Sequence, residues 1–259
     1  MRPEQRPSYG AMAASFSFHW SGGARSDDGL GYRRFLRTIG PLMKLYNSNL
    51  SPNALRTRAV IFELDLDPEI VNIDISKGEN RTPEYLKLNP NGKVPTLVDG
   101  KVVIWESRAI NAYLAALNPG HDLNPAGPAR RAAVDQWSYW QAIHLGPAMQ
   151  KIAFERVQKK LYGRGEPDEG AIAGELKTVG ELLSILDAAL AGKDWIAGTL
   201  SLADFAIATT FMFRRPAQLG VEAHANAAAW IERLEARPSW VKAVAPLLEL
   251  MRARGVDFG

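Results

Sequence analysis

The sequence has 259 residues with 46% apolar and 23% charged side chains, a balance typical of globular proteins with room for one large domain or two ordinary ones. Residues 1–42 hold six arginines against three acids and account for the whole net charge of +3, so the rest is neutral and we expect no nucleic-acid partner. No stretch approaches the ~20 apolar residues that a membrane span requires, so we expect no membrane partner either.

The chain contains no cysteine, which excludes disulfides, thiolate metal sites and a cysteine nucleophile. If redox chemistry occurs, the thiol must therefore come from a ligand. The four histidines lack the spacing of metal ligands, so the sequence predicts no metal.

Residues 1–42 contain scattered Gly, Ser, Arg and Pro and show no sustained helical or strand period. We interpret them as an N-terminal extension that is disordered, or that precedes a true start at Met43. The first strand signal follows directly after Met43.

Residues 43–118 mix strands and helices, which predicts an α/β domain. The expected elements are, in order, a strand at 44–46, a helix at 54–64, a strand at 70–75, a helix at 83–88, two strands within 96–105 and a helix at 109–117. Asp99-Gly100 separates the last two strands and is a strong signal for a two-residue hairpin turn. Ser107 falls at or near the N-cap of the last helix.

Residues 119–128 form the predicted linker, because residues 118–128 contain three prolines and two glycines. Residues 129–259 favour helix throughout and predict a second, all-helical domain. Its candidate helices lie near 129–161, 170–191, 202–215, 225–236 and 239–254. Ser201 and Asp204 form a variant of the capping box, which we assign to folding.

Residues 89–109 carry the most informative pattern, which reads Asn-Pro-Asn-Gly-Lys-Val-Pro-Thr-Leu, then the hairpin, then Glu-Ser-Arg-Ala. A cis bond before Pro95 would leave the backbone N–H and C=O of Val94 free to pair with an extended peptide ligand. A helix that starts at Ser107 offers a hydroxyl and free N–H groups to a carboxylate. Together these features resemble the thioredoxin-like domain of the cytosolic glutathione transferases, and the resemblance covers roughly Met43 to Arg254.

The resemblance implies an N-terminal thioredoxin-like domain at 43–118, a C-terminal all-helical bundle at 129–259 and glutathione as co-substrate. In that family, the residue before a cis-proline pairs with the cysteinyl backbone of glutathione, and a Glu/Gln-Ser pair holds the γ-glutamyl end. The residues that match are Val94, Pro95, Glu106 and Ser107.

The segment at 45–56 is similar to the loop of bacterial Ser/Asn-type transferases of the zeta, theta or nu-like kind. This likeness implies that Ser51 activates the thiol with support from Asn53. Ser-Pro-Asn before a helix is also a common capping sequence, and Tyr46 is a third candidate that we expect to pack. Lowering a thiol pKa of about 8.5 by two units requires about 2.7 kcal/mol, which one or two hydrogen bonds to the charged sulfur supply.

Four basic residues lie near these motifs, and two of them could bind the ligand. Lys93 and Arg108 could approach the glycyl and γ-glutamyl carboxylates, or they are solvated surface charges. Arg56 and Arg58 are expected on the surface of their helix.

Trp137, Trp140 and His144 share one face of the first long helix with Gln141, and in the family this helix borders the acceptor pocket. They form a predicted acceptor wall, although such a stripe is also typical of a core or a dimer interface.

The leading hypothesis is a cytoplasmic, homodimeric detoxification enzyme that transfers glutathione to a small hydrophobic electrophile. One alternative is glutathione-dependent reduction of peroxides or disulfides, as in nu-like proteins. An alternative of another class is a non-catalytic binding module with the same fold.

Overall fold

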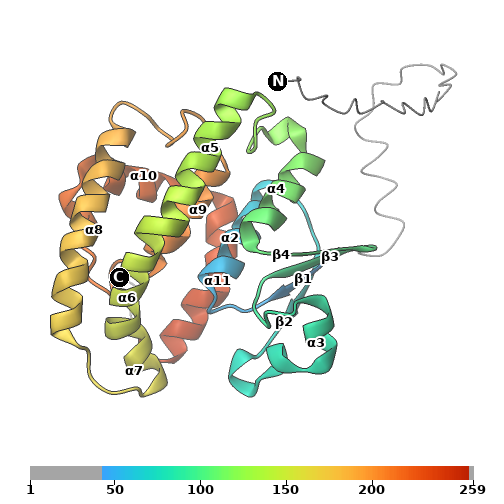
Figure 1. The fold of residues 1–259 in the computed structure, drawn as a ribbon, viewed down its shortest axis with the longest axis horizontal. Helices are drawn as coiled ribbons and strands as arrows, with labels where there is room; N and C mark the ends of the chain where they lie inside the picture. Colours follow the sequence, from blue (N-terminus) through green and yellow to red (C-terminus); the bar gives the residue numbers. More distant parts are fainter. Residues whose placement is uncertain (1–42, 257–259) are drawn as a thin grey trace, which may run out of the picture. The chain divides into compact units, whose positions relative to one another are not determined.

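The computed structural model describes residues 43–256 (Figure 1). The prediction for residues 1–42 lies outside the described residues. An α/β half comes first and a helical half follows, so the predicted fold class is confirmed. Within residues 43–256, no helix combines the length and the apolar character needed to cross a membrane.

A four-stranded sheet organises the first half, with the strand order β2-β1-β3-β4. The strands are β1 (Met43–Asn47), β2 (Glu69–Asn72), β3 (Thr96–Asp99) and β4 (Val102–Trp105). Strand β1 runs parallel to β2 and antiparallel to β3, and β3 runs antiparallel to β4. This mixed sheet is the one expected from the order of strands and helices in the sequence.

Two local details differ from the sequence prediction. The strand expected at 70–75 ends at Asn72, because the Asp74 carboxylate accepts the N–H groups of Ser76 and Lys77 and starts the 3₁₀ turn η1 (Ile75–Lys77). The hairpin is present, but Asp99 pairs with Val102, so the loop residues are Gly100 and Lys101. Gly100 has a φ of 58°, a conformation that favours glycine.

Three α-helices flank the sheet: α2 (Pro52–Glu63), α3 (Pro83–Leu88) and α4 (Ser107–Leu117). Helices α2 and α4 lie on the side that faces the helical half, and α3 lies on the other side (Figure 1). Two further 3₁₀ turns, η2 (Glu79–Arg81) and η3 (Pro119–His121), complete this half.

The helical half contains helices at all five predicted places. The first is one long helix made of α5 (Pro128–Trp140), the π-helical η4 (Gln141–Leu145), α6 (Gly146–Ala153), the π-helical η5 (Phe154–Gln158) and α7 (Lys159–Tyr162). The others are α8 (Glu169–Leu190), α9 (Leu202–Ala208) with the 3₁₀ segment η6 (Thr209–Phe213), η7 (Val221–Ala223), α10 (Ala225–Glu235) and α11 (Pro238–Ala253). The predicted capping box of Ser201 and Asp204 is present at the start of α9.

Helix α2 is enclosed between the sheet and α11 (Figure 1), and every residue from 54 to 61 is buried. Arg58, only 2% exposed, donates to the Ala243 carbonyl at 2.9 and 3.2 Å. Arg237 and Ser239 at the start of α11 both bind Glu63 at the end of α2, so the two helices are antiparallel. The expectation that Arg56 and Arg58 lie on the helix surface is therefore wrong, because this helix has no solvent-facing side over those residues.

Candidate functional site

Three chain segments enter or leave the sheet at the same end. Thr96, the first residue of β3, pairs with Tyr46 near the end of β1 and with Trp105 at the end of β4. The segment that leads to Ser51, the segment that carries Val94 and the segment that leads to Ser107 therefore start side by side. The sheet register brings together residues that are far apart in sequence.

The Val94–Pro95 peptide bond is cis, as the sequence pattern suggested. Within the described part of the chain, neither the N–H nor the C=O of Val94 has a hydrogen-bond partner. The preceding carbonyl of Lys93 is held firmly, because it accepts the Tyr85 hydroxyl at 2.6 Å and the Asn89 amide at 2.7 Å. The free N–H and C=O of Val94, in a loop held by these hydrogen bonds, can pair with the backbone of an extended ligand.

Further bracing comes from Asn80, whose side-chain amide donates to the Gly92 carbonyl at 2.7 Å. Asn89 belongs to the informative run in the sequence, but Asn80 and Tyr85 were not singled out. No pattern in the sequence sets these two residues apart, and both are buried.

Helix α4 begins with unsatisfied donors. Glu106 precedes it with a φ of 71°, which non-glycine residues rarely adopt, and no side chain caps the first turn. The first intrahelical bond runs from the Ile110 N–H to the Glu106 carbonyl at 3.0 Å, so the N–H groups of residues 107–109 have no partner among the described residues. Such a helix start favours a carboxylate.

Ser51 is the N-cap of α2, and its hydroxyl oxygen accepts the Ala54 N–H at 3.2 Å. The capping interpretation of this serine is therefore observed. It leaves the hydroxyl proton free, because accepting a hydrogen bond uses a lone pair only. Ser51 can thus cap the helix and donate to a ligand sulfur at the same time. The third candidate, Tyr46, is half-buried, and its ring packs edge-to-face against Tyr85.

Arg56 connects the starts of α2 and α4. Its Nη1 donates to Asn53 Oδ1 and to Ser107 Oγ, each at 2.7 Å, and the side chain is buried. Burial, and to a lesser extent the neighbouring Arg108, lower the pKa of Arg56 to about 9, while Glu106 opposes this shift. The sequence prediction missed the burial of Arg56 because it placed this residue on a polar surface of the helix.

Lys93 and Arg108 have different surroundings. Lys93 is exposed beside the open backbone of Val94. Arg108 donates from Nε to the carbonyl and hydroxyl of Ser138 at 3.3 and 3.1 Å, and from Nη2 to Gln141. These bonds tie the start of α4 to the long helix. Burial lowers the pKa of Arg108, against the effect of Glu106.

The predicted acceptor wall is not uniform. Trp137 and Trp140 are half-buried and stack edge-to-face with ring centroids 5.1 Å apart, and both pack against the core. Gln141 is buried and donates to Thr210 Oγ1 at 2.7 Å, whereas His144 is exposed. Among residues 43–256 no group of three or more histidine, aspartate or glutamate side chains is arranged to hold a metal ion.

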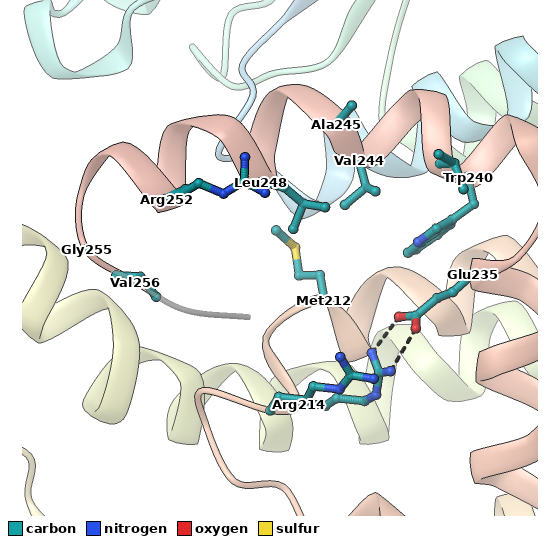
Figure 2. A pocket seen from close by; sticks show the side chains of 12 residues that line it. Met212, Arg214, Glu235, Trp240, Val244, Ala245, Leu248, Arg252, Gly255 and Val256 are labelled. Carbon is teal, nitrogen blue, oxygen red and sulfur yellow. Dashed lines mark hydrogen bonds and ion pairs between the residues drawn. The ribbon is translucent and has the colours of Figure 1, made fainter. Parts of the chain in front are cut away.

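A cavity of about 700 Å³ lies along α11 (Figure 2). Met212, Val244 and Leu248 turn their side chains into it, and Trp240 lines one end beside the ion pair of Arg214 and Glu235. Arg252 and Val256 line the other end. None of the residues in the predicted acceptor wall lines this cavity.

Comparisons with known proteins agree with this geometry. Residues 41–116 match the N-terminal domain of glutathione S-transferases, and residues 142–238 match the C-terminal domain. Glutathione S-transferase 3 of Zea mays is 36% identical over 79% of this chain and 94% of its own length, and probable glutathione S-transferase GSTF2 of Oryza sativa is 35% identical over 80% and 97%.

The structure of maize glutathione S-transferase I in complex with an atrazine glutathione conjugate has a TM-score of 0.73 and 32% identity, covering 78% of this chain and 96% of that one. These relatives are plant proteins and point to the phi class. The expected bacterial zeta, theta or nu-like subclass is therefore corrected.

Proposed function

The chain belongs to the glutathione S-transferase family, and we propose that it joins the thiolate of glutathione to small electrophilic substrates. The observation that carries this proposal is the meeting of three ligand-binding features at one end of the sheet. These are the free backbone pair of Val94, the uncapped start of α4 at Ser107 and the hydroxyl of Ser51.

Each feature suits one part of the tripeptide. Val94, presented by the cis bond to Pro95, pairs with the cysteinyl backbone. Ser107 and the N–H groups of α4, with Glu106 beside them, hold the γ-glutamyl carboxylate and amine. Lys93 attracts the glycyl carboxylate, while the donors of Arg108 bind Ser138 and Gln141.

The proposed chemistry depends on the sulfur. A donor at Ser51, supported by Asn53, stabilises the thiolate, which attacks the electrophilic carbon and displaces a leaving group or opens a strained ring. The thiol proton goes to solvent when the thiolate forms. After attack, the leaving group departs to solvent as an anion, or the alkoxide of an opened ring takes up a proton from solvent. No metal or redox partner is required for this step.

The electrophile has two candidate positions. The wall of Trp137, Trp140 and His144 is the one that the sequence indicated. The cavity along α11 is the alternative, because its volume suits a small organic ligand. The cavity lies on a different face of α11 from the one that packs on α2, because Ser239 and Ala243 bind residues of α2 and neither of them lines the cavity.

Substitutions can separate the two positions. Leu248→Trp fills the cavity, and His144→Trp alters the wall without changing the cavity. If the cavity binds the electrophile, Leu248→Trp raises the KM for the electrophile and leaves the KM for glutathione unchanged, while His144→Trp has little effect. The reverse result places the electrophile at the wall.

We also propose a cytoplasmic homodimer. Trp105 at the end of β4 and Tyr139 and Ile143 on the long helix expose 40%, 61% and 65% of their surface. The bonds from Arg108 to Ser138 bring these two segments close together, so their exposed apolar residues can form one patch that a second copy would cover. The cytoplasmic assignment rests on the family alone.

A substrate panel tests the proposed function. The purified chain is assayed with glutathione and, in turn, chlorodinitrobenzene, an epoxide, cumene hydroperoxide and hydroxyethyl disulfide. Turnover of the first two supports conjugation, whereas turnover of only the peroxide or the disulfide supports the reductase alternative. A chain that binds glutathione in calorimetry but turns over no member of the panel supports a binding module.

A further inference from the structure

Arg56 is a buried cation without a carboxylate partner in the described part of the chain. Only 4% of its surface is exposed, and no salt bridge with a described acid includes it. Its Nε also has no hydrogen-bond partner. Burying an unpaired charge is costly, so the fold tolerates a considerable penalty at this position.

The two hydrogen bonds of Arg56 are its distinctive feature. The same Nη1 lies 2.7 Å from Asn53 Oδ1 and 2.7 Å from Ser107 Oγ. These two residues stand at the starts of α2 and α4, the two helix ends that frame the candidate site. One guanidinium group therefore contacts the side chain assigned to the ligand sulfur and the side chain assigned to the γ-glutamyl carboxylate.

A guanidinium group can only donate, so it dictates how both partners are oriented. Because the oxygen of the Asn53 amide faces Arg56, its NH₂ group must point away from the arginine. Because Ser107 Oγ accepts from Arg56, the hydroxyl proton of Ser107 is free to point elsewhere. Without this contact the amide could turn over and the hydroxyl could rotate, so either group could present an acceptor instead.

We propose that Arg56 is a positioning residue that makes Asn53 and Ser107 present hydrogen-bond donors to glutathione. This inference rests on the proposed function. The Ser107 hydroxyl then donates to the γ-glutamyl carboxylate, and the Asn53 amide donates to the sulfur. Both ligand groups are anionic acceptors, so the donor orientation enforced by Arg56 is the one that each requires.

The charge of Arg56 acts in the same direction. It lies one side chain away from both proposed anions, with Arg108 also near and Glu106 as the opposing charge. A bound carboxylate and thiolate would therefore be stabilised by a cation that has no salt bridge to an acid among the described residues. Substitution of Arg56 must consequently affect glutathione affinity and thiol ionisation together.

Arg56→Met in the full chain tests this link, because methionine keeps the apolar stem and removes every donor. The ultraviolet absorbance of the bound thiolate is titrated against pH, and the KM for glutathione is measured with chlorodinitrobenzene. We expect the thiol pKa to rise by about one unit and the KM to rise about tenfold. Arg56→Lys keeps the charge and some donation, so it should recover part of both effects.

Arg58→Met is the matched control. Arg58 is equally buried two residues further along α2, but it donates to Ala243 and Asn47 and contacts neither Asn53 nor Ser107. We expect this variant to lower the thermal midpoint and to leave the thiol pKa unchanged. Equal effects of Arg56→Met and Arg58→Met on the thiol pKa would show that Arg56 is merely structural and overturn the inference.

Asn53→Asp keeps the test decisive if Arg56→Met does not fold. Asn53 is exposed, and an aspartate keeps the bond to Arg56 while turning an acceptor toward the sulfur in place of a donor. The thiol pKa must then rise, and an unchanged titration overturns the inference. If the wild-type chain binds no glutathione, both this inference and the proposed function fail. If the wild type binds and the variants titrate like it, only this inference fails.

Discussion

Replacing Asp204 by asparagine should destabilise the helical half strongly. The carboxylate is completely buried and accepts four hydrogen bonds at 2.9 to 3.0 Å. They come from the backbone N–H of Ile196, the indole of Trp230, and the backbone N–H and hydroxyl of Ser201. All four neighbours present donors, an arrangement that the two accepting oxygens of a carboxylate satisfy.

Asparagine keeps the volume but replaces one accepting oxygen by an NH₂ group. Two of the four donors then face another donor. At about 1.5–3 kcal/mol for each hydrogen bond to a charged group, the loss is about 3–6 kcal/mol, and relief from burying a charge offsets part of it. We expect the free energy of unfolding to fall by about 2–4 kcal/mol.

Urea unfolding followed by far-ultraviolet circular dichroism measures this change. Asp168→Asn is the control, because Asp168 is an exposed N-cap of α8 whose carboxylate accepts one N–H, from Ala171 at 3.0 Å. The Asp168→Asn change should lower the free energy of unfolding by no more than about 1 kcal/mol. Equal stabilities of the Asp204→Asn and Asp168→Asn variants would refute the reasoning.

The pH dependence gives a second measurement on the same residue. Burial raises the pKa of Asp204 above its usual value, against the effect of its hydrogen bonds. The native state therefore holds this proton to a higher pH than the unfolded chain does, so the contribution of this group to stability falls as pH rises between the ordinary and the raised pKa. Asp204→Asn should remove that slope, and an unchanged slope would assign it to other groups.

Three further predictions concern the site and the surface. Ser107→Ala should raise the KM for glutathione about tenfold in steady-state assays, because one hydrogen bond to a charged group is lost, and an unchanged KM would remove Ser107 from the γ-glutamyl site. Ser51→Ala should raise the pKa of the bound thiol by about one unit in the thiolate titration, and if the titration stays where it is, the donor must be Asn53 or Tyr46. The double variant Trp105→Glu, Ile143→Glu should give a monomer in light scattering after size-exclusion chromatography, whereas a persistent dimer would place the interface elsewhere.

Local patterns predicted the elements well because their causes are local. The hairpin requires a positive φ at Gly100, and α9 begins with a capping box at Ser201. Each of these features depends on a few adjacent residues, so the sequence reveals it. The ends of elements were less predictable. Strand β2 stops early because the Asp74 side chain captures the N–H groups that follow it, a competition that alternation of apolar residues does not reveal.

The order of strands and helices and the polar residues at the helix starts were accessible from the sequence, since each depends on neighbours in the chain. The cis bond before Pro95 was suggested by the family resemblance, because local sequence alone favours a trans bond. The position of Arg56 between Asn53 and Ser107, and the contact of Arg108 with Gln141, were decided only by the tertiary structure. Helical periodicity tells which residues share a face, but not what covers that face. Because α2 is covered by the sheet on one side and by α11 on the other, its arginines become buried groups of the fold and of the site.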